Sequence, residues 1–375
     1  MRATYKFLAL VIVVLFVGIF GCSDDSSSNG LSTYSDDIKD CAPDLSSSAS
    51  ALWINATGSD GWSPTAEYGV LKKLFHPDSG TESIYGPIES MDRIIDFINE
   101  FSQNFDENGT FTAESENTEL TATNEDLTGG VTSIPYLGGA ETNAIKLLNV
   151  TGSGDSSLTL KAAYGIDELK EYLVFRSKHE YTEDGVTQIE YTVCHASRDD
   201  ETGDISIELA SICDKNGDGS IETNPNVADD FLIRYKFVGN TLTKVFKLTQ
   251  KTNAGSGWGV MAGGSVASST DKVAVRATQN ADSTSGANDY TNITADATDV
   301  LGYYVVLTMD QINNPTSLDS SLDGDRRTVD GSWPKPASSF STETEEFKKY
   351  LIIGETDNLG WVNEYPAVIT DLNWD

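Results

Sequence analysis

The chain has 375 residues and a formal net charge of -33, from 58 acidic and 25 basic side chains. With 38% hydrophobic residues, it is long enough to bury a large core, so metals or disulfides are not needed as its main support. Its strongly acidic surface repels nucleic acid and anionic headgroups and attracts divalent cations. We therefore exclude nucleic acid as a partner.

The N-terminus has the three-part order of a secretory signal. Arg2 and Lys6 supply positive charge, and residues 7–20 form an apolar run that ends near Cys22. This run is shorter than the about 20 apolar residues that a permanent membrane helix needs. Residues 1–21 are therefore predicted to be a removable signal peptide.

Residues 19–22, Ile-Phe-Gly-Cys, resemble the lipobox of bacterial lipoproteins. The resemblance implies that signal peptidase cuts before Cys22 and that the Cys22 thiol is diacylated, which anchors the protein in a membrane of the cell envelope. Ser23 is similar to the residue that sends such proteins to the outer membrane, facing the periplasm or the exterior. Phe20 departs from the family pattern, which has a small residue there. An uncleaved anchor and an ordinary secretory signal are the alternatives.

Residues 22–50 are predicted to form a flexible tether. The segment from Ser23 to Gly30 contains only serine, aspartate, asparagine and glycine, and such a composition cannot offset its ordering entropy by burying apolar surface. More serines lie between residues 46 and 50. We therefore expect the packed domain to begin near Ala51 and to comprise residues 51–375.

Residues 88–105 are predicted to form one amphipathic helix. Pro87 stands where a helix start tolerates proline, and the apolar residues recur at spacings of three and four positions. The apolar stripe consists of Met91, Ile94, Ile95, Ile98, Phe101 and Phe105, and the other side carries Asp92, Arg93, Asp96 and Asn99. This pattern indicates that the helix packs on a sheet.

From about residue 158 to residue 307, apolar and polar residues alternate with the period of two that is typical of strands. Between the runs 172–181 and 186–195, Glu183-Asp184-Gly185 is a strong hairpin signal. A series of such hairpins predicts a mainly β fold, an antiparallel meander that forms a barrel or a sandwich, with the helix as its N-terminal element.

Three cysteines remain beyond Cys22, so one of them must stay single or pair between molecules. Alternation places Cys194 on the polar face of its strand and Cys213 on the apolar face of the next, so they can pair only if a bulge shifts one strand by a residue. We favour a Cys194–Cys213 disulfide, with Cys41 bound to either one as the rival. His195 beside Cys194 does not indicate a catalytic thiol, because neighbours on a strand point to opposite faces.

Residues 214–222, Asp-Lys-Asn-Gly-Asp-Gly-Ser-Ile-Glu, have the spacing of a loop that binds a hard cation. Asp214, Asn216 and Asp218 converge from a tight turn, the Ser220 carbonyl adds an oxygen, and Glu222 stands at position nine. The segment resembles the calcium loop of EF-hands and of the related dockerin and thrombospondin-type loops. The predicted metal is therefore calcium.

The resemblance to an EF-hand stops at the end of this loop. Position twelve, where the family has a bidentate glutamate, is Pro225, and the flanks read as strand and turn. We expect an isolated loop that braces two strands and binds calcium weakly, at about 10⁻⁴ to 10⁻³ M. Asp229 or Asp230 is a candidate for the missing carboxylate, and a plain turn is the alternative.

Enzyme signatures are weak: residues 263–267 lack the last glycine of a hydrolase elbow, and the three histidines have no metal-ligand spacing. We expect a lipid-anchored cell-envelope protein whose calcium-braced β domain has a binding or structural role towards an unidentified protein or glycan. The alternatives are a secreted hydrolase of polysaccharide or peptide and a β-barrel carrier of an apolar ligand.

Overall fold

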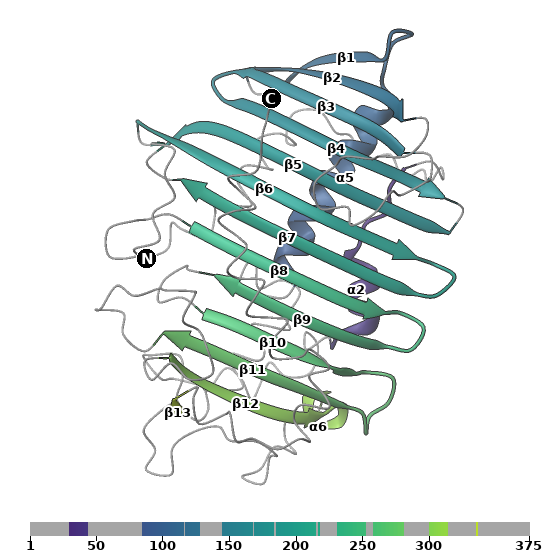
Figure 1. Ribbon diagram of the computed structural model, residues 1–375, viewed down its shortest axis with the longest axis vertical. Coiled ribbons are helices and arrows are strands. Elements are labelled where there is room, and N and C mark those ends of the chain that lie inside the picture. Colours follow the sequence, from purple (N-terminus) through teal and green to yellow (C-terminus); the bar gives the residue numbers. More distant parts are fainter. Residues whose placement is uncertain are drawn as a thin grey trace.

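The computed structural model describes residues 30–43, 85–115, 117–127, 145–167, 169–183, 185–214, 217, 231–252, 258–280, 300–313 and 335–336. Within these residues the chain forms one 13-stranded sheet and three helices (Figure 1). The helices are α2 (Ser35–Cys41), α5 (Gly86–Gln103) and α6 (Met309–Asn313). The strands are β1 (Thr110–Ser115), β2 (Thr118–Leu127), β3 (Ile145–Gly154), β4 (Ser157–Asp167), β5 (Lys170–Glu183), β6 (Val186–Asp199), β7 (Asp204–Asp214), β8 (Phe231–Asn240), β9 (Val245–Thr252), β10 (Trp258–Ser265), β11 (Lys272–Asn280), β12 (Val300–Thr308) and β13 (Lys335–Pro336).

The strands lie in the sheet in the same order as in the sequence, and every neighbouring pair is antiparallel. This arrangement confirms the predicted mainly β fold and its antiparallel meander. Of the two predicted forms, the barrel is not formed by the described strands, because β1 and β13 are the two edges of an open sheet.

The hairpin expected around Gly185 is formed by β5 and β6, which are 14 residues long each. Glu183 pairs with Val186 at the turn, and Gly185 has a φ of +81°. This left-handed backbone conformation is one that glycine adopts without a steric penalty. The sequence signal therefore specified both the turn and the register of the two longest strands.

One face of the sheet carries the hydrophobic core, and α5 lies against it (Figure 1). The helix confirms the predicted amphipathic element, although it begins at Gly86 and has its proline in the first turn. At its middle the Cys194 thiol lies 3.3 Å from the Met91 sulfur, and at its end the Phe101 ring contacts the Phe111 ring edge-on at 5.2 Å. The helix thus spans from the central strands to the edge strand β1.

The packed part of the chain begins about twenty residues earlier than the sequence suggested. Residues 30–43, which we call the strap, contain α2 and bury Leu31, Tyr34, Ile38 and Cys41 in the same core as α5. The predicted tether over residues 22–50 is therefore wrong for the strap. Its polar composition does not keep it in water, because side chains on α5 and on the sheet bind its backbone N–H groups and Asp37.

Candidate functional site

The predicted lipid attachment point, Cys22, lies outside the described residues. So do four of the five predicted calcium ligands, which are Asn216, Asp218, Ser220 and Glu222. Among the described residues, no group of three or more His, Cys, Asp or Glu side chains is placed to hold a metal ion. That finding does not bear on the calcium loop, most of which it does not include.

The fifth predicted ligand, Asp214, is fully buried at the end of β7. Its Oδ1 accepts a hydrogen bond of 2.7 Å from the Gly217 backbone N–H, and Gly217 has a φ of +66°. A Cβ at Gly217 would lie 2.6 Å from the Thr187 carbonyl oxygen, so glycine fits this close approach. A carboxylate-capped turn of this kind occurs in calcium loops and in plain turns alike.

The predicted Cys194–Cys213 disulfide is not present, since Cys41, Cys194 and Cys213 are all free and buried. The register of β6 and β7 is continuous, without the expected bulge, and pairs Cys194 with Leu209 and Cys213 with Glu190. The two cysteines share a face but lie four positions apart along it, about 13 Å at the rise of a strand. That distance is beyond the Cα separation that a disulfide can bridge.

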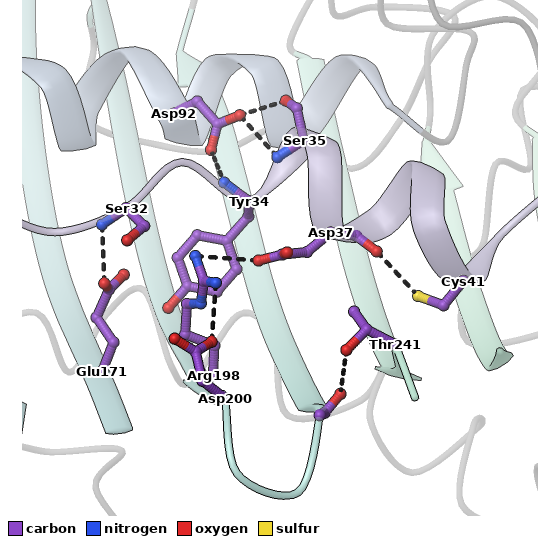
Figure 2. A network of polar contacts seen from close by, with 11 residues as sticks. Ser32, Tyr34, Ser35, Asp37, Cys41, Asp92, Glu171, Arg198, Asp200 and Thr241 are labelled. Carbon is purple, nitrogen blue, oxygen red and sulfur yellow. Dashed lines mark hydrogen bonds and ion pairs between the residues drawn. The ribbon is translucent and has the colours of Figure 1, made fainter. Parts of the chain in front are cut away.

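Two polar residues of α5, Asn99 and Asp92, hold the first half of the strap, and Figure 2 shows the contacts of Asp92. Asn99 exchanges two hydrogen bonds with the Leu31 backbone, at 2.7 Å and 2.6 Å. The Asp92 carboxylate accepts the backbone N–H groups of Tyr34 and Ser35, at 2.6 Å and 3.0 Å, and also the Ser35 hydroxyl. The polar side of α5, which was expected to face water, therefore contacts the strap.

The sheet holds the strap from the other side. Glu171 on β5 accepts the Ser32 backbone N–H at 2.8 Å, and Arg198 on β6 forms an ion pair of 3.1 Å with Asp37 (Figure 2). Arg198 also binds Asp200 at 2.9 Å, which fixes the guanidinium between two carboxylates. A single arginine therefore links α2 to the turn that follows β6.

The end of the strap meets the turn between β8 and β9. Cys41 donates to the Asp37 carbonyl at 3.3 Å, and a Cβ at Gly239 would lie 2.7 Å from the Cys41 sulfur. Lys244 forms an ion pair of 3.6 Å with Asp40. Glycine at position 239 thus lets α2 approach the sheet closely.

Burial controls the ionisation of the groups around the strap. Desolvation raises the pKa values of Asp92, Asp37 and Glu171 above their ordinary ranges, although Arg198 lowers those of Asp37 and Glu171 in part. Desolvation also raises the pKa of the Cys41 thiol to about 12. The thiol is therefore neutral and unreactive in the folded protein.

The turns along the strap side of the sheet are joined to one another, and we call this row of turns the rim. It comprises the turns β4–β5, β6–β7, β8–β9 and β10–β11, on the right in Figure 1. Backbone hydrogen bonds of 2.8 Å link successive turns: Asp200 to Leu169, Thr241 to Gly203, Val266 to Lys244, and Met309 of α6 to Asp271. The rim is thus a continuous edge and not a set of independent loops.

A second polar cluster lies on the core face of β5, β6 and β7, beyond the apolar core. His179, Glu190 and Cys213 occupy one row of directly paired positions across the three strands. Neighbouring rows add the other members, so that the buried set is His179, Gln188, Glu190, Thr192, Ser211 and Cys213. The core face of these three strands is therefore polar near the β5–β6 hairpin and apolar towards the other end of the strands.

Hydrogen bonds satisfy most of this polar cluster. Ser211 donates to Glu190 at 3.2 Å and shares a contact of 3.2 Å with the Thr192 hydroxyl. The His179 ring stacks on Tyr181 at 4.9 Å, and its Nδ1 has no partner in the described part of the chain. Such a network selects one arrangement of the three strands.

Burial favours the neutral forms of two titratable groups of the row, Glu190 and His179. Desolvation raises the pKa of Glu190 to about 7 and lowers the pKa of His179 to about 4. Glu190 can therefore take up or release a proton near neutral pH, which is the property of a general acid or base. In the part of the chain that the structure describes, no group of three or more His, Cys, Asp or Glu side chains is placed to hold a metal ion beside it.

Comparison of the chain with protein-family models, with curated proteins and with solved structures finds no match in any of the three. Within the described residues, no helix has both the length and the apolar composition needed to cross a membrane.

Neither the strap nor the buried polar cluster was predicted from the sequence. A signal for the strap exists, because Leu31, Tyr34, Ile38 and Cys41 recur at spacings of three and four residues, as on one face of a helix. Serines and aspartates between them hid the pattern. No comparable signal marks the polar cluster, because the alternation of polar and apolar residues predicts that Glu190 and Thr192 face solvent.

Proposed function

We propose that this chain is a lipid-anchored cell-envelope protein whose β domain has a binding or structural role. Cys22 would carry the lipid, and the protein would face the periplasm or the exterior. The observation that carries the proposal is the strap, because it is seated in the core and begins eight residues after the lipobox-like cysteine. A lipid on Cys22 would thus be coupled to the sheet through a short connection.

Calcium is the proposed cofactor, bound by the loop that starts at Asp214 and bracing the connection from β7 to β8. The support is the capped turn between Asp214 and Gly217, which gives the chain the tight bend that such a loop needs. No described feature favours the hydrolase or the carrier, so the binding or structural role is the one we put forward.

The lipid anchor is tested by expressing the full chain in a bacterial host with an alkyne-labelled fatty acid. The wild type is expected to incorporate the label and to enter the detergent phase on phase separation, and Cys22→Ser is expected to do neither. Cys41→Ser is the matched control, because it removes a buried thiol and leaves the lipobox intact. Equal labelling of wild type and Cys22→Ser would contradict the anchor.

Calcium binding is tested on the mature chain with Cys22→Ser, which retains the strap. Calcium should release heat and raise the melting temperature, and Asp214→Ala combined with Asp218→Ala should abolish both effects. Asp204→Ala, at the start of β7, is the control, since it removes a carboxylate from the other end of the same strand. An unchanged melting temperature in millimolar calcium would mean that the loop is a plain turn and does not bind calcium.

A further inference from the structure

We propose that the rim, and not the opposite end or a face of the sheet, rests on the membrane, with Leu169 and Leu242 inserted among zwitterionic lipid headgroups. This inference rests on the proposed lipid anchor at Cys22. It adds the orientation of the domain and a second contact with the lipid surface.

The rim exposes large apolar side chains at its tips. Leu242 in the β8–β9 turn is 66% exposed and Leu169 in the β4–β5 turn is 50% exposed, and Ile166 lies exposed at the end of β4. Of the five exposed large hydrophobic residues among the described ones, four lie at this end, the fourth being Val238 near the end of β8, and only Val186 lies at the opposite end. The turn-to-turn hydrogen bonds hold them as one surface, so their burial needs no reordering of loops.

The start of the strap places the anchor next to these leucines. Ser32 binds Glu171, which is the second residue of β5 and follows the Leu169 turn. The eight residues from Cys22 to Gly30 span at most about 29 Å. β5 ends at Glu183, and this other end of the strand lies about 40 Å from Glu171.

Charge selects the kind of lipid surface. The end of β6 and the β6–β7 turn, between the two leucines, carry Asp199, Asp200 and Glu201. Lys170 pairs with Asp199 and Arg198 with Asp200, so the repulsion comes from Glu201 and from the net charge of -33 of the whole chain. Anionic headgroups would repel this end, whereas zwitterionic headgroups would not. Two leucines alone bind a membrane weakly, but a tether of this length raises their effective concentration at the surface.

The test uses full-length lipidated protein in vesicles of phosphatidylethanolamine and phosphatidylcholine. Leu169→Cys and Leu242→Cys are each labelled with a polarity-sensitive fluorophore in the folded state, in which the three native cysteines of the described chain are buried. Val186→Cys is the matched control, since Val186 is 45% exposed at the opposite end of the same sheet. The unmodified protein serves as the labelling blank.

A blue shift and quenching by brominated lipid at positions 169 and 242, without either effect at 186, is the expected result. Equal signals at the three positions, or none, in protein that floats with the vesicles would overturn the rim contact and leave the anchor intact. Protein that does not float with the vesicles would instead overturn the proposed function on which the contact depends. Replacing part of the lipid with phosphatidylglycerol should weaken the shift at both leucines, and a stronger shift would contradict the zwitterionic preference.

Discussion

The buried side chain of Glu190 lowers the stability of the folded protein when it is ionised. It is 7% exposed on β6, where its oxygen accepts a single described hydrogen bond from Ser211. Because burial raises its pKa from 4.5 to about 7, its contribution to stability is fully present below about pH 4.5 and is lost as the pH rises through about 7.

Glu190→Gln should therefore raise the free energy of unfolding at about pH 8, by up to roughly 3 kcal/mol, and change it little at about pH 5. The amide keeps the acceptor for Ser211 and removes the buried charge. Chemical denaturation at the two pH values measures the difference. Glu180→Gln, on the opposite face of the neighbouring strand, is the control, and a gain of equal size at both pH values would refute the explanation.

The thiols give a second prediction at this scale. Cys41, Cys194 and Cys213 are free and buried, and burial raises the pKa values of Cys41 and Cys194. In the Cys22→Ser protein we expect no reaction with a thiol reagent at neutral pH in the folded state and three reactive thiols after denaturation. A mass lower by two hydrogens under non-reducing conditions would reveal a disulfide and contradict the structure.

Among the elements, the sheet could be predicted from the sequence and the strap could not. The turn at Gly185 and the alternation of apolar residues are local properties, and they specify neighbouring strands when those strands follow each other in the chain. Asp92 and Asn99 look like the solvent side of α5 by the same local rule. Only the tertiary structure shows that the strap covers them, because their partners lie 57 to 68 residues away.

The strap makes a specific prediction about stability. Ile38 is fully buried between α5 and the sheet, so Ile38→Ala should lower the free energy of unfolding by about 2 to 5 kcal/mol. Lys39→Ala, on the exposed side of the same helix, should change it by less than about 0.5 kcal/mol. Denaturant unfolding of the two variants measures both changes. Similar free energies of unfolding for the two variants would mean that residues 30–43 are a tether after all.

On the scale of the whole molecule, pH and salt should act together. The net charge of -33 makes the folded chain repel itself at neutral pH. The raised pKa values of Asp92, Asp37, Glu171 and Glu190 mean that their contributions to stability are lost as the pH rises. His179, whose pKa is lowered, acts in the opposite direction only below about pH 6.5.

The melting temperature should therefore be higher at about pH 6.5 than at about pH 8, and sodium chloride should reduce this difference by screening the surface charges over about 10 Å at 0.1 M. Differential scanning calorimetry in the presence of a chelator measures both effects without calcium binding. A sugar that carries no charge should raise the melting temperature similarly at the two pH values. A melting temperature that rises from pH 6.5 to pH 8 would contradict the raised pKa of Glu190.

The position of the strap also determines how the protein would respond to mechanical force. A pull on Cys22 would reach the fold at the start of the strap, which is bound in turn to Asn99 and Asp92 on α5 and to Glu171 and Arg198 on the sheet. The force would therefore enter the molecule at α5 and the central strands β5 and β6. The edge strands β1 and β13 would carry none of it, so the sheet would not be unzipped one strand at a time.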